Sequence, residues 1–151
     1  MRLIDEYNID VLGKKVVVIG KSNIVGLPIS LMLMKRNATV TICHKHTGED
    51  ILKKYTQEAD IIISCCGQPK MIKKEWIKEG VIIIDIGINK IAANNDTNNS
   101  TKKSLIVGDV DFEDVKDKVS AISPVPGGVG PMTIASLMKN TVIAAERHLS
   151  K

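Results

Sequence analysis

The sequence is poor in aromatic residues, which make up only 3% of its 151 positions. Proteins that bind single-stranded nucleic acid stack bases on aromatic side chains, so this scarcity disfavours that class. The core must instead be aliphatic, and abundant isoleucine and valine are typical of parallel strands buried on both faces. The formal net charge is only +4 and the lysines are scattered, so we expect no nucleic-acid partner.

Cysteine is scarce too, and its spacing is typical of neither a disulfide framework nor a metal site. Cys43, Cys65 and Cys66 stand in or beside apolar runs, so we interpret them as reduced core thiols and expect no metal. No run reaches the ~20 apolar residues that cross a bilayer, and no secretory signal opens the chain. We therefore expect a cytoplasmic protein without a membrane partner. An organellar location stays open, because a targeting segment could precede Met1.

Short apolar runs alternate with helical patterns along the chain. We expect strands at 15–20, 39–43, 60–65, 81–86, 106–110 and 119–122. We expect helices at 1–7, 29–36, 49–57, 73–78, 112–118 and 134–148. This order predicts one α/β domain over residues 1–151, with a Rossmann-like, doubly wound parallel sheet in a three-layer α/β/α arrangement. Residues 92–103, rich in Asn, Thr, Ser and Lys, are expected to form a surface insertion.

Ligands of such sheets bind at the carboxyl ends of the strands. We expect five segments to converge there, namely 20–26, 43–47, 65–69, 86–89 and 123–131. The first of them, GKSNIVG, occupies the place of a dinucleotide phosphate loop, between a strand and a helix. Ser22 replaces the usual second glycine and Gly26 comes one residue late. Such a glycine pair can be a plain turn, but its context favours a phosphate site in which Ser22 donates a hydrogen bond.

The end of the second expected strand indicates the choice of nucleotide. A site that prefers NAD places an acid there to hold the ribose 2′-hydroxyl. Here the strand continues into Cys43-His44-Lys45-His46-Thr47, with no acid before Glu49. Lys21, Lys45 and His44 could surround an additional phosphate, which favours NADP. A solvated basic loop without a ligand is the alternative.

The segment PVPGGVGPMT, residues 124–133, joins an apolar run to a helical one. Its prolines and glycines predict a stiff loop that is neither helix nor central strand. A loop with few side chains lets main-chain amides approach a ligand closely, at the N-terminus of the following helix. A sharp turn with no ligand is the alternative interpretation.

In the order GKSNIVGLP, CHKHT, CCGQP, DIGIN, VGDVDF and PVPGGVGPMT, these motifs resemble the cofactor domain of the bifunctional methylenetetrahydrofolate dehydrogenase/cyclohydrolase family. The resemblance runs from about Leu3 to Leu149 and is interrupted by the Asn-rich insertion. It implies NADP-dependent oxidation of 5,10-methylenetetrahydrofolate to the methenyl form, followed by hydrolysis to 10-formyltetrahydrofolate. A tetrahydrofolate derivative and a homodimer formed through this domain are the partners it implies.

The resemblance also implies site residues. Those expected to bind the cofactor are Gly20, Lys21, Ser22, Ile24, Val25, His44, Lys45, Cys66, Gly67 and Ile88, of which Lys45 serves the 2′-phosphate and Ile88 the nicotinamide side. Those expected to border the folate are Pro126, Gly127, Gly128, Val129 and Gly130. Lys21 stands where Arg is frequent in the family, which keeps the charge but loses the bidentate fork.

The family's catalytic lysine and neighbouring tyrosine belong to a preceding domain, and no lysine near the start of this chain matches that position. We therefore expect no catalytic residue within these 151 positions and no turnover by the chain alone. Two alternatives remain: a stand-alone, non-catalytic NADP(H)-binding or interaction module, and a different two-domain dehydrogenase.

Overall fold

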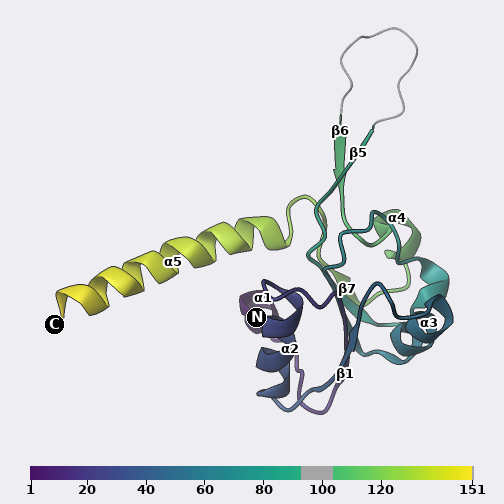
Figure 1. The fold of residues 1–151 in the computed structure, drawn as a ribbon, viewed down its shortest axis with the longest axis horizontal. Coiled ribbons are helices and arrows are strands. Elements are labelled where there is room, and N and C mark those ends of the chain that lie inside the picture. The colour runs from purple at the N-terminus through teal and green to yellow at the C-terminus, as the bar shows by residue number, and fades with distance from the viewer. Residues whose placement is uncertain (93–103, 151) are drawn as a thin grey trace, which may run out of the picture.

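A five-stranded parallel sheet is the centre of the molecule, seen in a computed structural model that describes residues 1–92 and 104–150 (Figure 1). Its strands are β1 Lys15–Ile19, β2 Thr39–Cys43, β3 Ile61–Ser64, β4 Ile82–Asp85 and β7 Ala121–Ile122. They lie in the order β2-β1-β3-β4-β7. The chain thus leaves β1 toward one edge of the sheet and returns to β3 on the other side of β1. This reversal confirms the doubly wound α/β topology and creates a switch point between β1 and β3.

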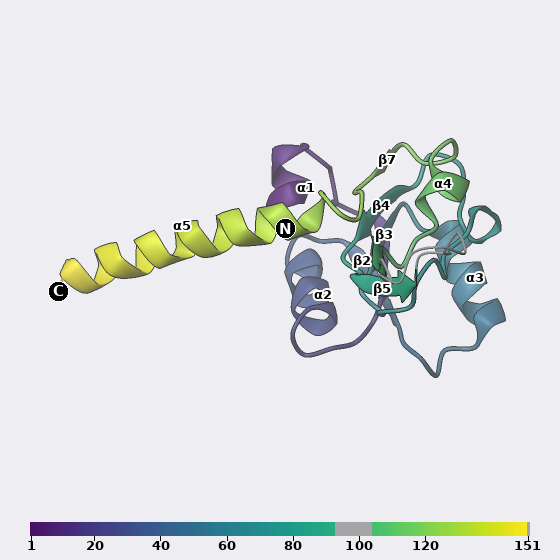
Figure 2. The same cartoon turned by 90° about the horizontal axis from the view of Figure 1, so that it is seen from above.

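Helices cover both faces of the sheet. They are α1 Arg2–Glu6, α2 Gly26–Met34, α3 Glu49–Glu58, the 3₁₀ turn η1 Lys74–Trp76, α4 Phe112–Val115 and α5 Val129–Leu149. Because successive side chains of a strand alternate, Val17 of β1 packs with Leu52 of α3 and with Trp76. Val18 packs with Leu33 of α2 on the other face. Figure 2 shows α1 and α2 on one side of the sheet and α3 and α4 on the other, which confirms the three layers.

The region between β4 and β7 differs from the prediction. We expected one strand at 106–110, but β5 (Asn89–Ala92) and β6 (Ser104–Val107) form a separate antiparallel ribbon, in which Asn89 pairs with Val107 (Figure 1). The predicted insertion falls largely outside the described residues, and only Ala92 is seen, at the end of β5. Neither strand was predictable as part of a ribbon, because β5 carries Asn and Lys at half of its four positions.

The helix before the C-terminus begins earlier than predicted. We expected residues 124–133 to be loop throughout, but α5 starts at Val129, so Val129 to Thr133 are helical. Pro131 lies in the first turn, where the N–H groups have no partner within the helix, so its missing donor costs little. The expectation that proline and glycine exclude helix was therefore wrong for the second half of this segment.

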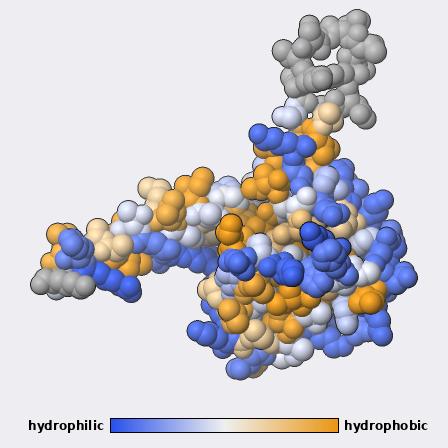
Figure 3. All heavy atoms as spheres, viewed as in Figure 1, coloured by the Kyte–Doolittle hydropathy of each residue, from blue (hydrophilic) through white to orange (hydrophobic). Residues whose placement is uncertain are grey.

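α5 projects away from the sheet, and none of its 21 residues is buried (Figure 1). Ile134, Leu137, Met138 and Val142 are each more than half exposed and recur at a spacing that places them on one face. Figure 3 shows apolar surface along this helix. No described helix is both long enough and apolar enough to cross a membrane.

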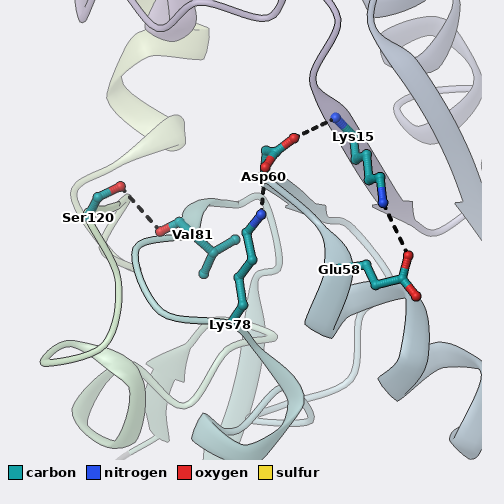
Figure 4. A network of polar contacts seen from close by, with 6 residues as sticks. All are labelled: Lys15, Glu58, Asp60, Lys78, Val81 and Ser120. Carbon is teal, nitrogen blue, oxygen red and sulfur yellow. Dashed lines mark hydrogen bonds and ion pairs between the residues drawn. The ribbon is translucent and has the colours of Figure 1, made fainter.

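Charged and polar side chains tie the strands together at the amino edge of the sheet (Figure 4). Asp60, just before β3, accepts a hydrogen bond from the main-chain N–H of Lys15 at 2.8 Å and pairs with the ammonium group of Lys78. Lys15 in turn pairs with Glu58. This edge lies opposite the strand ends at which ligands bind, so we interpret its contacts as structural.

Asp60 predicts a pH dependence of stability. Its hydrogen bonds from Lys78 and from the N–H of Lys15 lower the pKa of its carboxyl group. A lowered pKa stabilises the fold above the unfolded-state pKa, and this contribution is lost as the pH falls through the folded value, below about pH 4. We expect Asp60→Asn to lower the free energy of unfolding by at most about 1 kcal/mol at pH 6, because the pair is partly exposed. Urea unfolding should show that the difference from wild type narrows at pH 3; a constant difference would contradict the assignment.

Candidate functional site

A cavity of about 530 Å³ lies at the switch point of the sheet. Three strand ends contribute its polar rim: Gly20, Lys21 and Ser22 after β1, His44, Lys45 and Thr47 after β2, and Cys65 and Cys66 after β3. Leu52 of α3 and Trp76 of η1 also line it. The structure thus brings together six of the ten residues expected to bind the cofactor, from segments separated by more than 20 positions.

Two glycines allow the first loop to fold against its neighbours. Gly20 has a φ of +123°, and a Cβ there would lie 2.4 Å from the carbonyl oxygen of Cys65. A Cβ on Gly26, the first residue of α2, would lie 2.0 Å from the carbonyl oxygen of Gly20. Neither position has room for a side chain. The main chain between them therefore passes close to both β3 and α2, as the cradle of a phosphate loop requires.

Ser22 caps the helix that follows this loop. Its hydroxyl oxygen accepts hydrogen bonds from the N–H groups of Val25 at 3.1 Å and Gly26 at 3.5 Å. Val25 directly precedes α2 and Gly26 is its first residue, so neither N–H group has a partner within the helix. Because the hydroxyl acts here as an acceptor, its own hydrogen remains available for a phosphate oxygen. The expected donor role of Ser22 is thus compatible with its structural role.

A tight turn presents the basic residues after β2. The hydroxyl of Thr47 accepts a hydrogen bond from the N–H of His44 at 3.0 Å, and Nδ1 of His44 accepts one from the N–H of His46 at 3.2 Å. These bonds leave Nε2 of His44 for other partners. Lys45 is exposed on the same turn and borders the cavity.

One carboxylate also lines the cavity, and it is neutralised within α3. Glu49 pairs with Lys53 at 2.6 Å, one helical turn away. The ammonium group of Lys53 lies 5.1 Å from the ring centre of Trp76, so the cation contacts both the acid and the floor of the cavity. The positive charge of Lys53 thus offsets the negative charge of Glu49, and this reduces the repulsion between Glu49 and an anionic ligand.

The other expected cofactor residues lie outside this cavity. Ile24, Val25, Gly67 and Ile88 do not line it, and Ile88 is 69% exposed beside the start of β5. Ile24 and Val25 belong to the loop that enters α2, and Gly67 follows the cavity residue Cys66. All four follow the carboxyl end of a strand: Ile24 and Val25 follow β1, Gly67 follows β3 and Ile88 follows β4.

Three of the five residues expected to border the folate line two further cavities. Gly127 and Gly128 line a mostly apolar one of about 820 Å³, together with residues of α1, β4 and β7. Val129 lines a small one between α1 and α2. The fold of this loop leaves no room for a side chain at Gly128, because a Cβ there would lie 2.4 Å from the carbonyl oxygen of Pro124. Pro126 and Gly130 line none of these cavities.

Sequence reasoning missed two buried carboxylates behind the site. Asp85 ends β4 and accepts hydrogen bonds from the N–H groups of Gly87, Asp109 and Val110 at 2.8–3.1 Å. Burial raises the pKa of Asp85, while these N–H bonds oppose the rise. Asp109, wholly buried, receives hydrogen bonds from the segment after β3. The sequence signal was a glycine close to each acid, in DIG and GD. Each glycine lies against the other acid, since a Cβ on Gly87 would meet Asp109 and one on Gly108 would meet Asp85.

The comparisons with known proteins agree with this geometry. The NAD(P)-binding domain of tetrahydrofolate dehydrogenase/cyclohydrolase matches residues 1–149. The chain belongs to this family. Its relatives include the bifunctional protein FolD of Sulfurihydrogenibium, 51% identical over 99% of this chain and 48% of that protein. Another is the mitochondrial C-1-tetrahydrofolate synthase of Saccharomyces cerevisiae, 48% identical over 98% of this chain and 15% of that protein.

A solved family structure has the same fold. The methylenetetrahydrofolate dehydrogenase-cyclohydrolase of Trypanosoma brucei, in complex with NADP cofactor and an inhibitor, superposes with a TM-score of 0.90. It is 36% identical to this chain and is covered over 50% of its length. The chain therefore spans about half the length of its FolD relatives. Within the family it corresponds to the NAD(P)-binding domain, as the motifs predicted.

The two thiols at the cavity should be unreactive. Burial, and secondarily the charge of Asp109, raises the pKa of Cys65 from 9.0 to about 11 and that of Cys66 to about 12. At pH 8 the thiolate of Cys65 is then about 100-fold scarcer than at the ordinary pKa. We expect iodoacetamide to label Cys65 of the native chain about 100-fold more slowly than in guanidinium, and Cys66 more slowly still, as measured by mass spectrometry of digests. Equal rates in the two conditions would contradict these environments.

Proposed function

We propose that this chain is the NADP-binding lobe of a methylenetetrahydrofolate dehydrogenase/cyclohydrolase of one-carbon metabolism. The complete enzyme oxidises 5,10-methylenetetrahydrofolate to the methenyl form and hydrolyses that product to 10-formyltetrahydrofolate. The observation that carries the proposal is the switch-point cavity with its Gly20–Gly26 cradle, in a chain whose family match covers residues 1–149. The name of the T. brucei relative supports both the reaction and the cofactor.

The residues at the cavity fit a dinucleotide. The main chain at Gly20, the hydroxyl of Ser22 and the N-terminus of α2 would bind the diphosphate. Lys21 and Lys45 with His44 would surround the 2′-phosphate of NADP. Glu49 is paired with Lys53, so its carboxylate is less free to accept a hydrogen bond from the ribose 2′-hydroxyl of NAD. The bound cofactor supplies the hydride acceptor, whereas the protein binds and orients it.

The folate side of the reaction would use the PVPGGVGPMT segment and residues outside this chain. Pro126 to Gly130 stand at the junction of β7 and α5, beside the apolar cavity that Gly127 and Gly128 line. The FolD relatives are about twice as long as the match, and the exposed apolar face of α5 suits a second lobe that packs on it. We assign no catalytic residue to this chain.

Two further expectations belong to the same proposal. A homodimer through this domain is supported by the exposed Leu105 and Ile106 on the β5–β6 ribbon, whose outer edges pair with no other strand among residues 1–92 and 104–150. A cytoplasmic location is supported by the free cysteines, and the name of the yeast relative leaves a mitochondrial one open.

Nucleotide preference tests the cofactor assignment. We expect the chain to bind NADP+ at least tenfold more tightly than NAD+, because cations and no unpaired acid surround the 2′ position. The preference should decrease with salt, since exposed charges are screened. Calorimetry with both nucleotides at low and moderate ionic strength measures it.

Lys45→Asp provides the decisive variant. It places a carboxylate where the 2′-phosphate would lie, so the preference should reverse. Lys35→Asp, remote from the cavity, changes the net charge equally and should leave the preference unchanged. Equal affinity for the two nucleotides in the wild type would defeat the assignment of NADP.

Measuring turnover tests whether the catalytic groups lie outside this chain. We expect no dehydrogenase or cyclohydrolase activity from the 151-residue chain, because proximity and general acid–base catalysis are worth many orders of magnitude and their groups lie elsewhere. Absorbance of methenyltetrahydrofolate with excess protein measures both steps. Activity in a homogeneous preparation would place the catalytic group within these residues. NADP(H) binding without recovery of activity beside a folate lobe would instead favour the stand-alone module.

A further inference from the structure

Asp109 is a wholly buried carboxylate that is satisfied by neutral donors. Its Oδ2 accepts hydrogen bonds from the N–H groups of Cys66 at 2.8 Å and Gly67 at 3.2 Å, and from the hydroxyl of Ser64 at 3.1 Å. Its Oδ1 accepts one from Nδ2 of Asn89 at 2.9 Å. Among residues 1–92 and 104–150, no basic side chain forms an ion pair with it. A buried charge held in this way is costly unless each donor stays in place, so it fixes the donors as firmly as they fix it.

The donors belong to two segments at the carboxyl edge of the sheet. Cys66 lines the switch-point cavity, and Gly67 continues the same loop. Asn89 begins β5 and directly follows Ile88, the residue expected on the nicotinamide side. The two segments follow different strands, β3 and β4. One carboxylate thus joins the wall of the cavity to the residues beside the expected nicotinamide.

The main chain of Asp109 is held in place by the second buried carboxylate, that of Asp85. Its N–H donates to Oδ1 of Asp85 at 3.1 Å, and Asp85 also accepts the N–H of Gly87. A Cβ on Gly87 would lie 2.2 Å from Oδ1 of Asp109, so the main chain passes against the carboxylate. Asp109 does not line the switch-point cavity and cannot contact a ligand there. Any effect on binding must pass through the segments that it holds.

We propose that Asp109 is a positioning residue for the dinucleotide: it sets the spacing between the Cys66–Gly67 loop and Ile88–Asn89. The inference rests on the proposed function, because it assumes that NADP spans these segments. It adds to that proposal a residue that does not line the cavity but holds the two segments expected to contact the dinucleotide. In a folded chain without the carboxylate, the two segments move independently and binding loses its preorganisation.

The chain offers a control carboxylate at the opposite edge of the sheet, which is partly exposed whereas Asp109 is buried. Asp60 also accepts a main-chain N–H and a side-chain donor, but at the amino edge of the sheet (Figure 4). Asp109→Asn and Asp60→Asn each replace a hydrogen-bonded carboxylate by an amide of the same shape. We expect Asp109→Asn to weaken NADP+ binding about tenfold in calorimetry at 25 °C, and Asp60→Asn to change it less than twofold. Tm is measured on both preparations.

A milder variant decides the question if Asp109→Asn does not fold. Asn89→Ala removes the donor to Oδ1 and leaves the bonds from Cys66 and Gly67. We expect this variant to lower the affinity for NADP+ several-fold. The affinity for adenosine 2′,5′-bisphosphate, which lacks the nicotinamide, should stay within twofold of the wild-type value. A merely structural role would not separate these two ligands.

The outcomes separate this role from the proposed function. Wild-type chain that fails to bind NADP+ would overturn the proposed function and the role with it. Wild-type binding with unchanged affinity in Asp109→Asn or Asn89→Ala would overturn the role alone. An equal loss of affinity in Asp60→Asn and Asp109→Asn would show that general loosening of the sheet, rather than positioning, is responsible.

Discussion

The carboxyl edge of the sheet depends on two buried acids whose partners are main-chain N–H groups and uncharged side chains. Asp85 binds the turn after β4 and the segment after β6, and Ser123 contacts the main chain of Asp85 from the end of β7. Asp109 extends the network to the loop after β3. A Cβ on Gly108 would lie 1.9 Å from Oδ2 of Asp85, so the main chain approaches the acids as closely as it can. The strand ends are held by dipoles, which leaves the cations of this edge for a ligand.

The two edges of the sheet use charge differently. At the amino edge Lys15 and Lys78 pair with Glu58 and Asp60, so cation and anion balance within the protein. At the carboxyl edge Lys21 and Lys45 form no ion pair with any residue in 1–92 or 104–150. Positive charge gathered at strand ends and a helix N-terminus attracts an anion. The contrast separates the part of the molecule that stabilises the sheet from the part available for binding.

The sequence predicted the sheet well because each strand of Ile and Val ends in a recognisable turn. Gly20 after β1 and the His44–Thr47 turn after β2 were enough to predict a site at the carboxyl ends of the strands, whereas the position of the switch point follows from the strand order in the structure. The β5–β6 ribbon was missed because its residues carry no alternation strong enough to distinguish antiparallel pairing from another parallel strand. Asp85 and Asp109 were missed for another reason. An acid close to a glycine is typical of a turn, and the burial of these two acids follows only from tertiary contacts. Three-dimensional proximity, rather than residue type, distinguishes these acids from surface ones.

The two large cavities divide the site into unequal halves. The switch-point cavity has a hydroxyl, imidazole and ammonium groups on its rim, which are the groups that a dinucleotide phosphate needs. The segment Ser123–Thr133 beside the apolar cavity carries no titratable side chain, so it can shape a ligand's surroundings but cannot exchange a proton with it. α5 continues from this segment with its apolar face exposed. The titratable side chains at the apolar cavity are instead Tyr7, Asp10 and Lys14, which lie near the start of the chain. The two cavities therefore differ in chemistry, because cations surround the first whereas the loop at the second contributes shape alone.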